Sequence, residues 1–293
     1  MASNRDGSPR RRGADICATA SPKMTDADFR RFSEFITAEL GIKLPPTKKT
    51  MLEARLQKRL RALGLGSHRD YCEFLFSPEG MERELAQLID VVTTNTTHFF
   101  REPKHFEILS QQVAPDIFRR KNGGRAAIWS AGCSTGEEPY TLAMVLSEFA
   151  AQNPGFAFSI LATDISTQVL QQAQRAVYLE DRIEGIPQEY KRKYLLRSKD
   201  RTRRLVRMGP ELRRLIQFRR LNFMNDFDFR DLQDVIFCRN VVIYFDRGTQ
   251  EQLFKRFCGK LAPGGYLFIG HSESLTGMDL PLVPVAPTVY RKT

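Results

Sequence analysis

The sequence predicts an α/β protein in which an all-helical region precedes a doubly wound, mainly parallel sheet. From Ala126 onward, short apolar runs alternate with helix-like stretches, as expected where helices join the strands of a parallel sheet. Before residue 118, apolar residues recur every three or four positions, which indicates helices. The turn-forming residues Asn122-Gly123-Gly124 separate the two patterns. We therefore expect a helical N-terminal domain with its linker over 24–121 and a sheet domain over 122–293.

The first expected helix begins at Thr25, which with Asp28 resembles a capping box. Gly41 and the pair Pro45-Pro46 end this helix. The second helix carries a stripe of leucines and, on an adjacent face, the basic residues Lys48, Arg55, Lys58 and Arg59. The same periodicity predicts three further helices over 69–76, 81–91 and 103–120.

In the sheet domain, we expect strands over 126–130, 158–163, 266–270 and 288–291, and another within 234–245. Helices are expected over 137–150, 166–176 and 249–261, the second with Ser166 as its N-cap. A basic segment interrupts this alternation and holds two β-type runs, 205–208 and 215–218, on either side of Gly209-Pro210. We predict that it forms a small antiparallel β insertion at about 188–221.

Charge and composition restrict the class of protein. The net charge of +11 favours an acidic partner, and residues 191–220 alone hold 13 basic residues against Asp200 and Glu211. No apolar stretch approaches the roughly 20 residues that span a bilayer. The five cysteines form no Cys-x-x-Cys pair, which favours reduced thiols over a disulfide framework or a zinc site. We expect a cytoplasmic protein without membrane insertion, with a disordered basic tail over 1–23 and a start at either Met1 or Met24.

A glycine-containing loop follows the first expected strand, within residues 129–140. In doubly wound sheets such a loop lies at the carboxyl ends of the strands, where ligands bind. Gly132 and Gly136 permit positive φ angles and a close approach of the ligand to the backbone. The loop ends in Glu137 and Glu138, whose carboxylates would repel a pyrophosphate. They suit a ligand that carries an ammonium group and sugar hydroxyls.

Polar residues also follow two other expected strands. Asp164 ends the second strand, where its carboxylate can accept hydrogen bonds from both ribose hydroxyls of a nucleoside. Arg239 and Asn240 interrupt the apolar run 237–245, and buried polar groups need partners. They either face the ligand crevice or form a structural pair. Tyr244, in the same run, is either a core residue or an aromatic face beside a cationic group.

Four segments of the chain together resemble the CheR family, the chemotaxis receptor methyltransferases: 93–102, 129–140, 237–245 and 270–274. The similarity extends from about Met24 to Tyr290. It implies a helical N-terminal domain packed on a Rossmann-like S-adenosylmethionine methyltransferase domain, with a cofactor pocket between them. It also implies methyl transfer to glutamate carboxylates of chemoreceptor cytoplasmic domains, which sets sensory adaptation and leaves S-adenosylhomocysteine.

By motif position, the resemblance implies a set of residues that contact the cofactor. These are Asn95, Thr97 and Arg101 between the domains, Gly132 and Glu138 in the loop, Asp164 at the ribose, Asn222 and Phe223 at the adenine, and Arg239 and Asn240 at the methyl end. Glu137 remains an alternative to Glu138. Arg101 and Arg239 are candidates to orient a carboxylate of the substrate or cofactor, and Tyr244 is a candidate to bound the transfer site.

The expected chemistry needs neither a metal nor a general base, because a glutamate side chain is already ionised at neutral pH. The small β insertion resembles a subdomain that binds a short peptide at the receptor C-terminus, although it is otherwise explained as a solvated basic face. The basic face of the second helix resembles one that approaches the acidic methylation region, with the same alternative. We expect a monomer that binds no nucleic acid.

Two other functions are compatible with parts of the sequence. The segment 132–136 matches the Gly-x-Ser-x-Gly elbow of serine hydrolases, and His271 follows with Asp226 or Asp246 between. Too few strands precede this elbow for that fold. The positive charge also suggests a nucleic-acid methyltransferase, but the Asn/Asp-Pro-Pro-Tyr run typical of amino-group methylation is absent from the segment 237–245.

Overall fold

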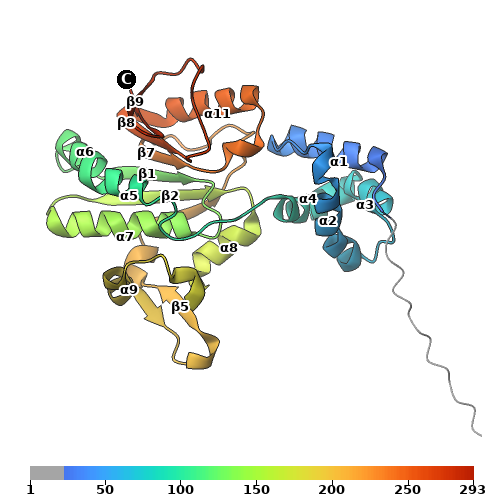
Figure 1. Ribbon diagram of the computed structural model, residues 1–293, viewed down its shortest axis with the longest axis horizontal. Coiled ribbons are helices and arrows are strands. Elements are labelled where there is room, and N and C mark those ends of the chain that lie inside the picture. Colours follow the sequence, from blue (N-terminus) through green and yellow to red (C-terminus); the bar gives the residue numbers. More distant parts are fainter. Residues whose placement is uncertain (1–22) are drawn as a thin grey trace, which may run out of the picture.

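The computed structural model describes residues 23–293, so the predicted basic tail lies outside the described residues except for Lys23. Its helical domain, at the right of Figure 1, consists of α1 (Asp26–Leu40), α2 (Lys49–Leu63), α3 (His68–Leu75) and α4 (Pro78–Val92). The predicted capping box is confirmed, since Thr25 Oγ1 accepts from the Asp28 amide at 3.1 Å while the Asp28 carboxylate accepts from the Thr25 amide at 3.4 Å. Gly41 ends α1 in the left-handed conformation, at a φ of 70°.

The leucine stripe of α2 enters the core of the helical domain. On the basic face beside it, two arginines bind to other parts of this domain and a lysine is exposed. The Arg59 guanidinium forms a two-pronged ion pair with the buried Glu84 of α4, at 2.7 and 2.9 Å. Arg55 Nη1 donates to the carbonyl oxygens of Val91, Val92 and Thr93, at 3.3, 2.7 and 3.1 Å. These two arginines therefore hold the domain together, while Lys58 remains exposed.

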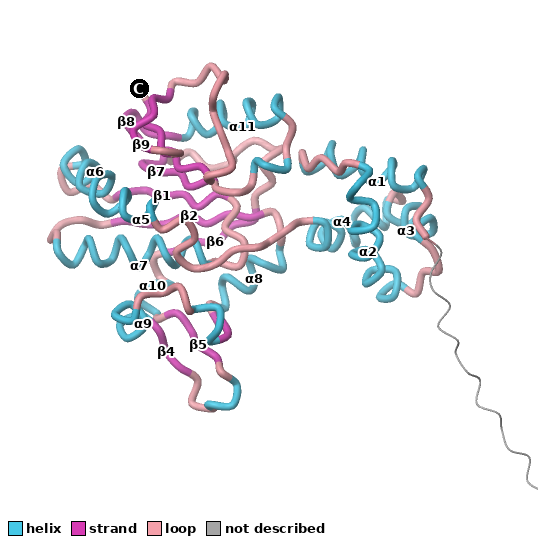
Figure 2. Tube along the Cα trace, viewed as in Figure 1, coloured by secondary structure: helices cyan, strands magenta, loops and turns pink. Residues whose placement is uncertain are grey.

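The sheet domain contains a seven-stranded sheet in the order β6-β2-β1-β7-β8-β10-β9 (Figure 2). The strands are β1 (Ala126–Ala131), β2 (Phe158–Asp164), β6 (Ile216–Arg220), β7 (Gln233–Cys238), β8 (Leu261–Ile269), β9 (Leu282–Ala286) and β10 (Val289–Lys292). The first five in the sheet order run parallel, and β10 is antiparallel to both of its neighbours. The predicted doubly wound, mainly parallel sheet is confirmed.

Helices cover both faces of this sheet. One face packs against α7 (Glu137–Gln152) and a nearly continuous helix made of α5 (Lys104–Ile108), the π-helix η2 (Leu109–Val113) and α6 (Ala114–Lys121). The other face packs against α11 (Arg247–Lys260). After β2 comes α8 (Thr167–Arg175), with Ser166 as its N-cap as predicted.

The helices α5 to α6 belong to the sheet domain. Their side chains Phe106, Leu109 and Ile117 pack in one cluster with Ile128 of β1, whereas the helical-domain core ends at Val92. The boundary between the two packed units therefore lies in the extended segment after α4, earlier than the predicted boundary at residue 121.

A separate antiparallel sheet follows α8, in the order β3 (Val177–Leu179), β5 (Leu205–Met208) and β4 (Leu195–Arg197). The helices η3 (Glu180–Ile183) and α9 (Gln188–Tyr194) and the turn η4 (Arg201–Arg203) connect its strands. An antiparallel insertion is thus confirmed, but the predicted range of 188–221 is wrong. The run at 215–218 forms β6 at the edge of the large sheet, because Gly209 and Pro210 start the short helix α10 (Pro210–Arg213) instead of a hairpin turn.

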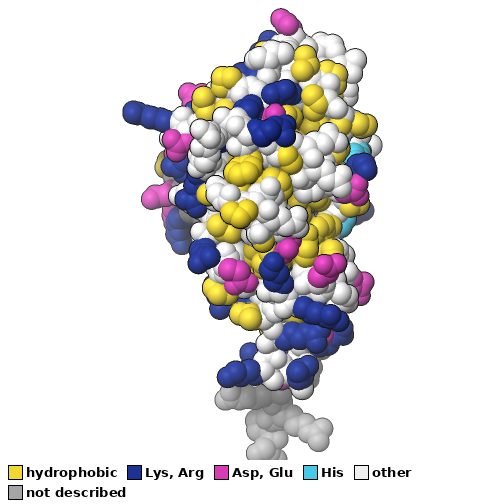
Figure 3. Space-filling view, turned by 90° about the vertical axis from the view of Figure 1, so that its left-hand side faces the viewer, with side chains coloured by type: hydrophobic (Ala, Val, Ile, Leu, Met, Phe, Trp, Pro, Cys, Tyr) yellow, Lys and Arg dark blue, Asp and Glu magenta, His cyan; other side chains and the backbone are white. Residues whose placement is uncertain are grey.

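Lys and Arg side chains gather on the small sheet and its connections, over the lower part of the face in Figure 3. The exposed basic residues here are Arg192, Lys193, Arg197, Lys199, Arg201, Arg203, Arg204 and Arg207. In the described part of the chain, no helix has both the length and the apolar character needed to cross a bilayer.

Candidate functional site

A cleft lies between the helical domain and the carboxyl ends of β1, β2 and β7, and together with the solvent at its open mouth it measures about 1230 Å³. The sheet order reverses between β1 and β7, which is where doubly wound sheets bind ligands. All eleven predicted site residues line this cleft: Asn95, Thr97, Arg101, Gly132, Glu138, Asp164, Asn222, Phe223, Arg239, Asn240 and Tyr244. The structure thus brings together side chains from five separate parts of the sequence.

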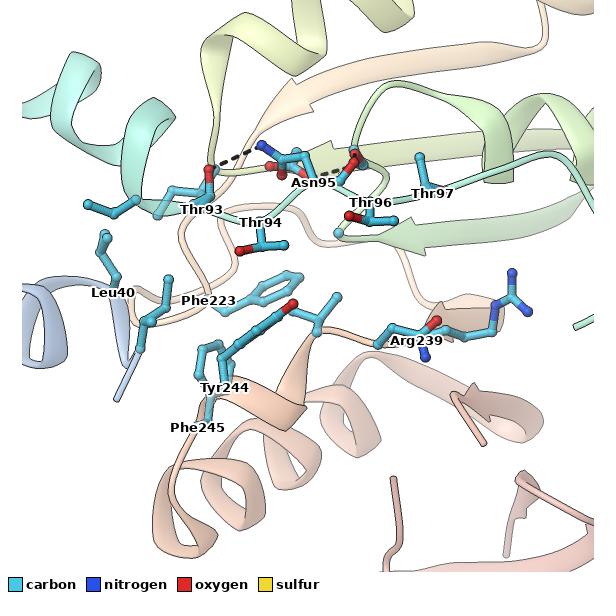
Figure 4. A pocket seen from close by; sticks show the side chains of 18 of the residues that line it. Leu40, Thr93, Thr94, Asn95, Thr96, Thr97, Phe223, Arg239, Tyr244 and Phe245 are labelled. Carbon is cyan, nitrogen blue, oxygen red and sulfur yellow. Dashed lines mark hydrogen bonds between the residues drawn. The ribbon is translucent and has the colours of Figure 1, made fainter. Parts of the chain in front are cut away.

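The extended segment between the domains forms one wall of the cleft, opposite Phe223, Tyr244 and Phe245 (Figure 4). Asn95 Nδ2 donates to Thr93 Oγ1 at 3.2 Å, and the Asn95 carbonyl accepts from Ser134 Oγ at 3.0 Å. These bonds fix the segment directly over the glycine-containing loop.

The loop after β1 is held close to Asp164. Its backbone places Ser134 at a φ of 49°, and the Ser134 amide donates to Asp164 Oδ2 at 2.8 Å. The other oxygen, Oδ1, accepts from the Ser166 amide at 3.0 Å. Burial raises the pKa of Asp164, although both amides favour its ionised form. The carboxylate retains lone pairs that can accept hydrogen bonds from a ligand in the cleft.

Gly132 has a structural reason to be glycine. Its φ is +86°, and a Cβ atom there would lie 2.5 Å from Val241 Cγ2. The loop after β1 and the loop after β7 therefore pack against each other directly at the floor of the cleft.

The two glutamates at the start of α7 have different surroundings. Glu138 lines the cleft, and its carboxylate accepts from Ser130 Oγ at 2.7 Å and from Arg239 Nε at 2.8 Å. Glu137 is completely buried, where it accepts from Thr135 Oγ1 at 2.6 Å and pairs with Arg182 at 2.5 Å. Of the two alternatives that the sequence left open, Glu138 is the one at the cleft.

The Arg239 side chain is buried and contacts several residues around the cleft. Besides its bond to Glu138, Nη1 donates to the Arg101 carbonyl at 2.7 Å and lies 3.3 Å from Glu102 Oε2. The guanidinium also lies over the rings of Phe106 and Phe237. Figure 4 shows it directed away from Tyr244. These contacts orient the cleft wall, and the guanidinium is already satisfied by protein groups.

Glu102, His105 and His271 bring one potential ligand atom each to within 4.8 Å of one another, a distance compatible with a metal site. However, Arg239 Nη1 lies 3.2 Å from His105 Nδ1 as well as close to Glu102. A guanidinium at this point supplies the positive charge that a metal ion would bring, so the donor set fits an ion pair better. Burial and Arg239 lower the pKa of His105 to about 4, which keeps the ring neutral at neutral pH.

The remaining predicted residues lie at the end of the cleft nearest the helical domain. Asn222 Nδ2 donates to the Glu39 carbonyl at 2.8 Å, which ties the turn after β6 to α1. Phe223 is mostly buried and packs edge-on against Trp129. The Tyr244 carbonyl accepts from the Lys43 amide at 2.9 Å. The two hydrogen bonds, from Asn222 to Glu39 and from Lys43 to Tyr244, join the two domains around the mouth of the cleft.

Sequence reasoning did not assign the part of the cleft that the helical domain supplies. This part consists of residues after α1 and at the start of α2, namely Leu40, Ile42, Lys43, Leu44, Lys48 and Met51. Only Lys48 had been singled out, as part of a basic helix face. The local signals here are those of an ordinary helix end, so the sequence offers no mark of function at these positions.

The geometry does not support a serine hydrolase. Ser134 Oγ donates to a backbone carbonyl, that of Asn95, whereas His271 Nε2 lies 4.0 Å from Glu102 Oε2. A hydrolytic serine needs a base within hydrogen-bond reach. The arrangement instead combines acceptors for an amine and a ribose, a glycine that permits close approach and an aromatic side chain at one end. This donor and acceptor set fits S-adenosylmethionine.

Comparison with known proteins agrees with this geometry. Residues 27–93 match the family model of the CheR methyltransferase all-alpha domain, and residues 95–289 match that of the CheR methyltransferase SAM binding domain. A probable chemotaxis protein methyltransferase of Rhizobium etli is 40% identical, over 88% of this chain and 97% of its own length. The chemotaxis protein methyltransferases of Borreliella burgdorferi and Escherichia coli are 39% and 37% identical, over 92% and 91% of this chain and 95% and 91% of their own lengths. The chain therefore belongs to the CheR family of S-adenosylmethionine-dependent methyltransferases.

Proposed function

We propose that this protein methylates glutamate side chains on the cytoplasmic domains of chemoreceptors and thereby sets sensory adaptation. The observation that carries the proposal is the convergence of eleven motif residues on one cleft, in a chain that matches both CheR domains. When bound, S-adenosylmethionine supplies a methyl group activated by the neighbouring sulfonium. Every other requirement falls on the protein's own side chains.

These side chains bind and orient. Asp164 would accept hydrogen bonds from the ribose hydroxyls, Glu138 would accept from the ammonium group, and Phe223 would lie on the adenine side of the site. The substrate carboxylate is already ionised and needs no general base. The reaction then depends on alignment of the attacking oxygen and on exclusion of water, which a cleft between two domains provides.

The cations that face the cleft favour an acidic substrate. Lys43, Lys48 and Arg101 line it, and only Arg101 was expected at this place. Arg239 points elsewhere and is already paired, so we assign the attraction of the substrate carboxylate to Arg101 and the two lysines. Tyr244 bounds the transfer site on the opposite side.

We further propose that the protein acts as a cytoplasmic monomer, and that the small antiparallel sheet binds a peptide at the receptor C-terminus. The basic side chains on that sheet support an acidic partner. Nucleic acid is a weaker candidate, because the small sheet and its connections expose no aromatic side chain on which bases could stack.

The test is incubation of the purified protein with tritiated S-adenosylmethionine and membranes that contain chemoreceptors. We expect label on a receptor that mild base removes as methanol, because the product is an ester. Label that resists base, or label on nucleic acid alone, would contradict the proposal. The variant Asp164→Asn serves as a control in which cofactor binding is weakened, so that labelling at a limiting concentration of S-adenosylmethionine should fall.

A further inference from the structure

The loop after β7 turns sharply as it enters the cleft. Asn240 adopts a left-handed conformation, with a φ of 58°, which costs free energy for a residue with a side chain. The turn directs the amides of Asn240, Val241 and Val242 toward one point. Backbone amides that converge in this way form a site for an anion.

The carboxylate of Glu273 occupies that point. Its Oε2 accepts from the amides of Asn240 at 3.0 Å and Gly270 at 2.6 Å, and its Oε1 accepts from those of Val241 and Val242, both at 3.0 Å. Glu273 is 7% exposed. All four partners are donors, which fits the ionised carboxylate, since a carboxyl O–H would face another donor.

Gly270 provides the space for this arrangement. A Cβ atom on Gly270 would lie 2.6 Å from Asn240 Nδ2 and 2.9 Å from the Asn240 amide nitrogen. The segment 270–274, which marks the family resemblance but does not line the cleft, is therefore shaped around Asn240.

The loop that Glu273 holds contacts other residues around the cleft at two places. Val241 packs against Gly132, and the Asn240 side-chain amide donates to Glu102 Oε1 at 3.3 Å. Both Asn240 and Val241 line the cleft. A displacement of their backbone would move this wall relative to the loop after β1.

We propose that Glu273 is a positioning residue for methyl transfer, whose carboxylate fixes the turn Asn240–Val242 and thereby holds Asn240 and Val241 in the wall of the cofactor cleft. Glu273 does not itself line the cleft. The inference adds a residue to the methyl-transfer site and rests on cofactor binding, so it does not depend on which receptor is methylated.

The test compares Glu273→Gln with Asp234→Asn in the full-length protein. Asp234 is a matched control because it is also buried, its carboxylate also accepts a backbone amide (that of Ala127, at 2.8 Å), and it lies at the opposite end of β7. Glutamine would turn an N–H₂ group toward two amide donors. We expect E273Q to raise the Kd for S-adenosylhomocysteine by about tenfold and to lower kcat with little change in the receptor KM. D234N should leave all three within about twofold.

Hydrogen exchange separates positioning from general stability. In E273Q the amides of Asn240, Val241 and Val242 should exchange faster, with β1 and β7 unchanged. If E273Q binds S-adenosylhomocysteine as the wild type does, or if D234N weakens binding equally, the inference is overturned. Should E273Q fail to fold, Gly270→Ala decides, because it keeps the carboxylate but displaces Asn240. G270A with unchanged affinity would also overturn the inference.

Discussion

Arg239 is the central cation among the buried charged groups at the cleft. Burial and this arginine together determine the protonation state of His105. The guanidinium pairs with Glu138 and Glu102 and also donates toward His105 Nδ1. The other ring nitrogen, Nε2, lies 2.8 Å from Thr288 Oγ1. A neutral imidazole with its proton on Nε2 satisfies both contacts, since Nδ1 then accepts and Nε2 donates.

Stability should consequently depend on pH through His105. Its pKa in the folded protein is about 4, because burial and Arg239 disfavour the charged ring, whereas an unfolded chain titrates near the ordinary value of about 6.5. As pH falls below about 6.5, the unfolded state takes up the proton first. The free energy of unfolding should therefore decrease by about 3 kcal/mol between pH 6.5 and pH 4 from this group.

Urea unfolding at several pH values measures this effect. His105→Gln should show a flatter dependence between pH 6.5 and pH 4 than the wild type. Glu102, Arg239 and His271 also face the ring and are present in both proteins, so the comparison isolates the replacement of His105. An unchanged slope in H105Q would contradict the assignment.

Asp164 should dominate cofactor affinity. Asp164→Asn removes the negative charge and turns a donor toward the amide of Ser134 or of Ser166, while it also loses acceptors for the ribose. We expect the Kd for S-adenosylhomocysteine to rise about a hundredfold, equivalent to about 2.7 kcal/mol, as measured by calorimetry. Asp116→Asn is the control, because Asp116 pairs with Arg120 away from the cleft and its loss should leave the Kd within about twofold.

At the scale of elements, Arg55 of α2 holds the end of α4. Its guanidinium donates to three carbonyls in the last turn of α4 and the residue after it, which have no partners within the helix. This turn leads directly into the segment that forms a wall of the cleft. Arg55 is therefore first a structural residue, although its position on a basic face suggested contact with a substrate.

The variant Arg55→Ala should lower the free energy of unfolding by about 1–2 kcal/mol, because three partly buried carbonyls lose a charged donor. Lys58→Ala, from the same helix but with an exposed side chain, should change it by less than about 0.5 kcal/mol. Denaturant unfolding followed by far-ultraviolet circular dichroism provides the comparison. Equal effects of the two variants would show that Arg55 acts only as a surface charge.

The prediction of secondary structure succeeded where neighbouring residues determine the structure. It failed where the structure depends on residues far away in the sequence. The capping box at Thr25 and the N-cap at Ser166 depend on neighbouring residues and were predictable. The sequence predicts that the run at 215–218 belongs to the small sheet, because this run and the run at 205–208 lie on either side of Gly209-Pro210 within one basic segment. Its partner in the structure is β2, whose residues lie more than 50 positions earlier, and a β-type run carries no information about which strand it joins.

At the scale of the whole molecule, part of the cleft could likewise be predicted from the sequence and part could not. The motif residues of the sheet domain could be placed, because strand ends and a glycine-containing loop identify their edge of the sheet. The contribution of α1 and α2 could not, because it depends on how the two domains pack. Lys43 lines the cleft at a point where its amide donates to the Tyr244 carbonyl, about 200 residues later in the chain.

The basic small sheet should act on receptor encounter and not on cofactor binding. Replacing Lys199, Arg201, Arg203 and Arg204 with serine removes four exposed charges far from the cleft. We expect the receptor KM to rise several-fold at low salt, with an unchanged Kd for S-adenosylhomocysteine. The wild-type KM should rise with ionic strength and approach that of the variant, since salt screens exposed charges. If the receptor KM changes neither with salt nor with these substitutions, the small sheet is not part of the receptor interface.

The cleft between the domains also has a mechanical consequence. Because its walls come from both domains and from the segment that joins them, any ligand bound there ties the two together. At a concentration a hundred times its Kd, such a ligand adds about 2.7 kcal/mol to the joined arrangement. Bound cofactor should therefore restrain the motion of the helical domain relative to the sheet domain. The two domains should move least when the cellular concentration of S-adenosylmethionine is high, so that the mobility of the domains depends on the supply of the methyl donor.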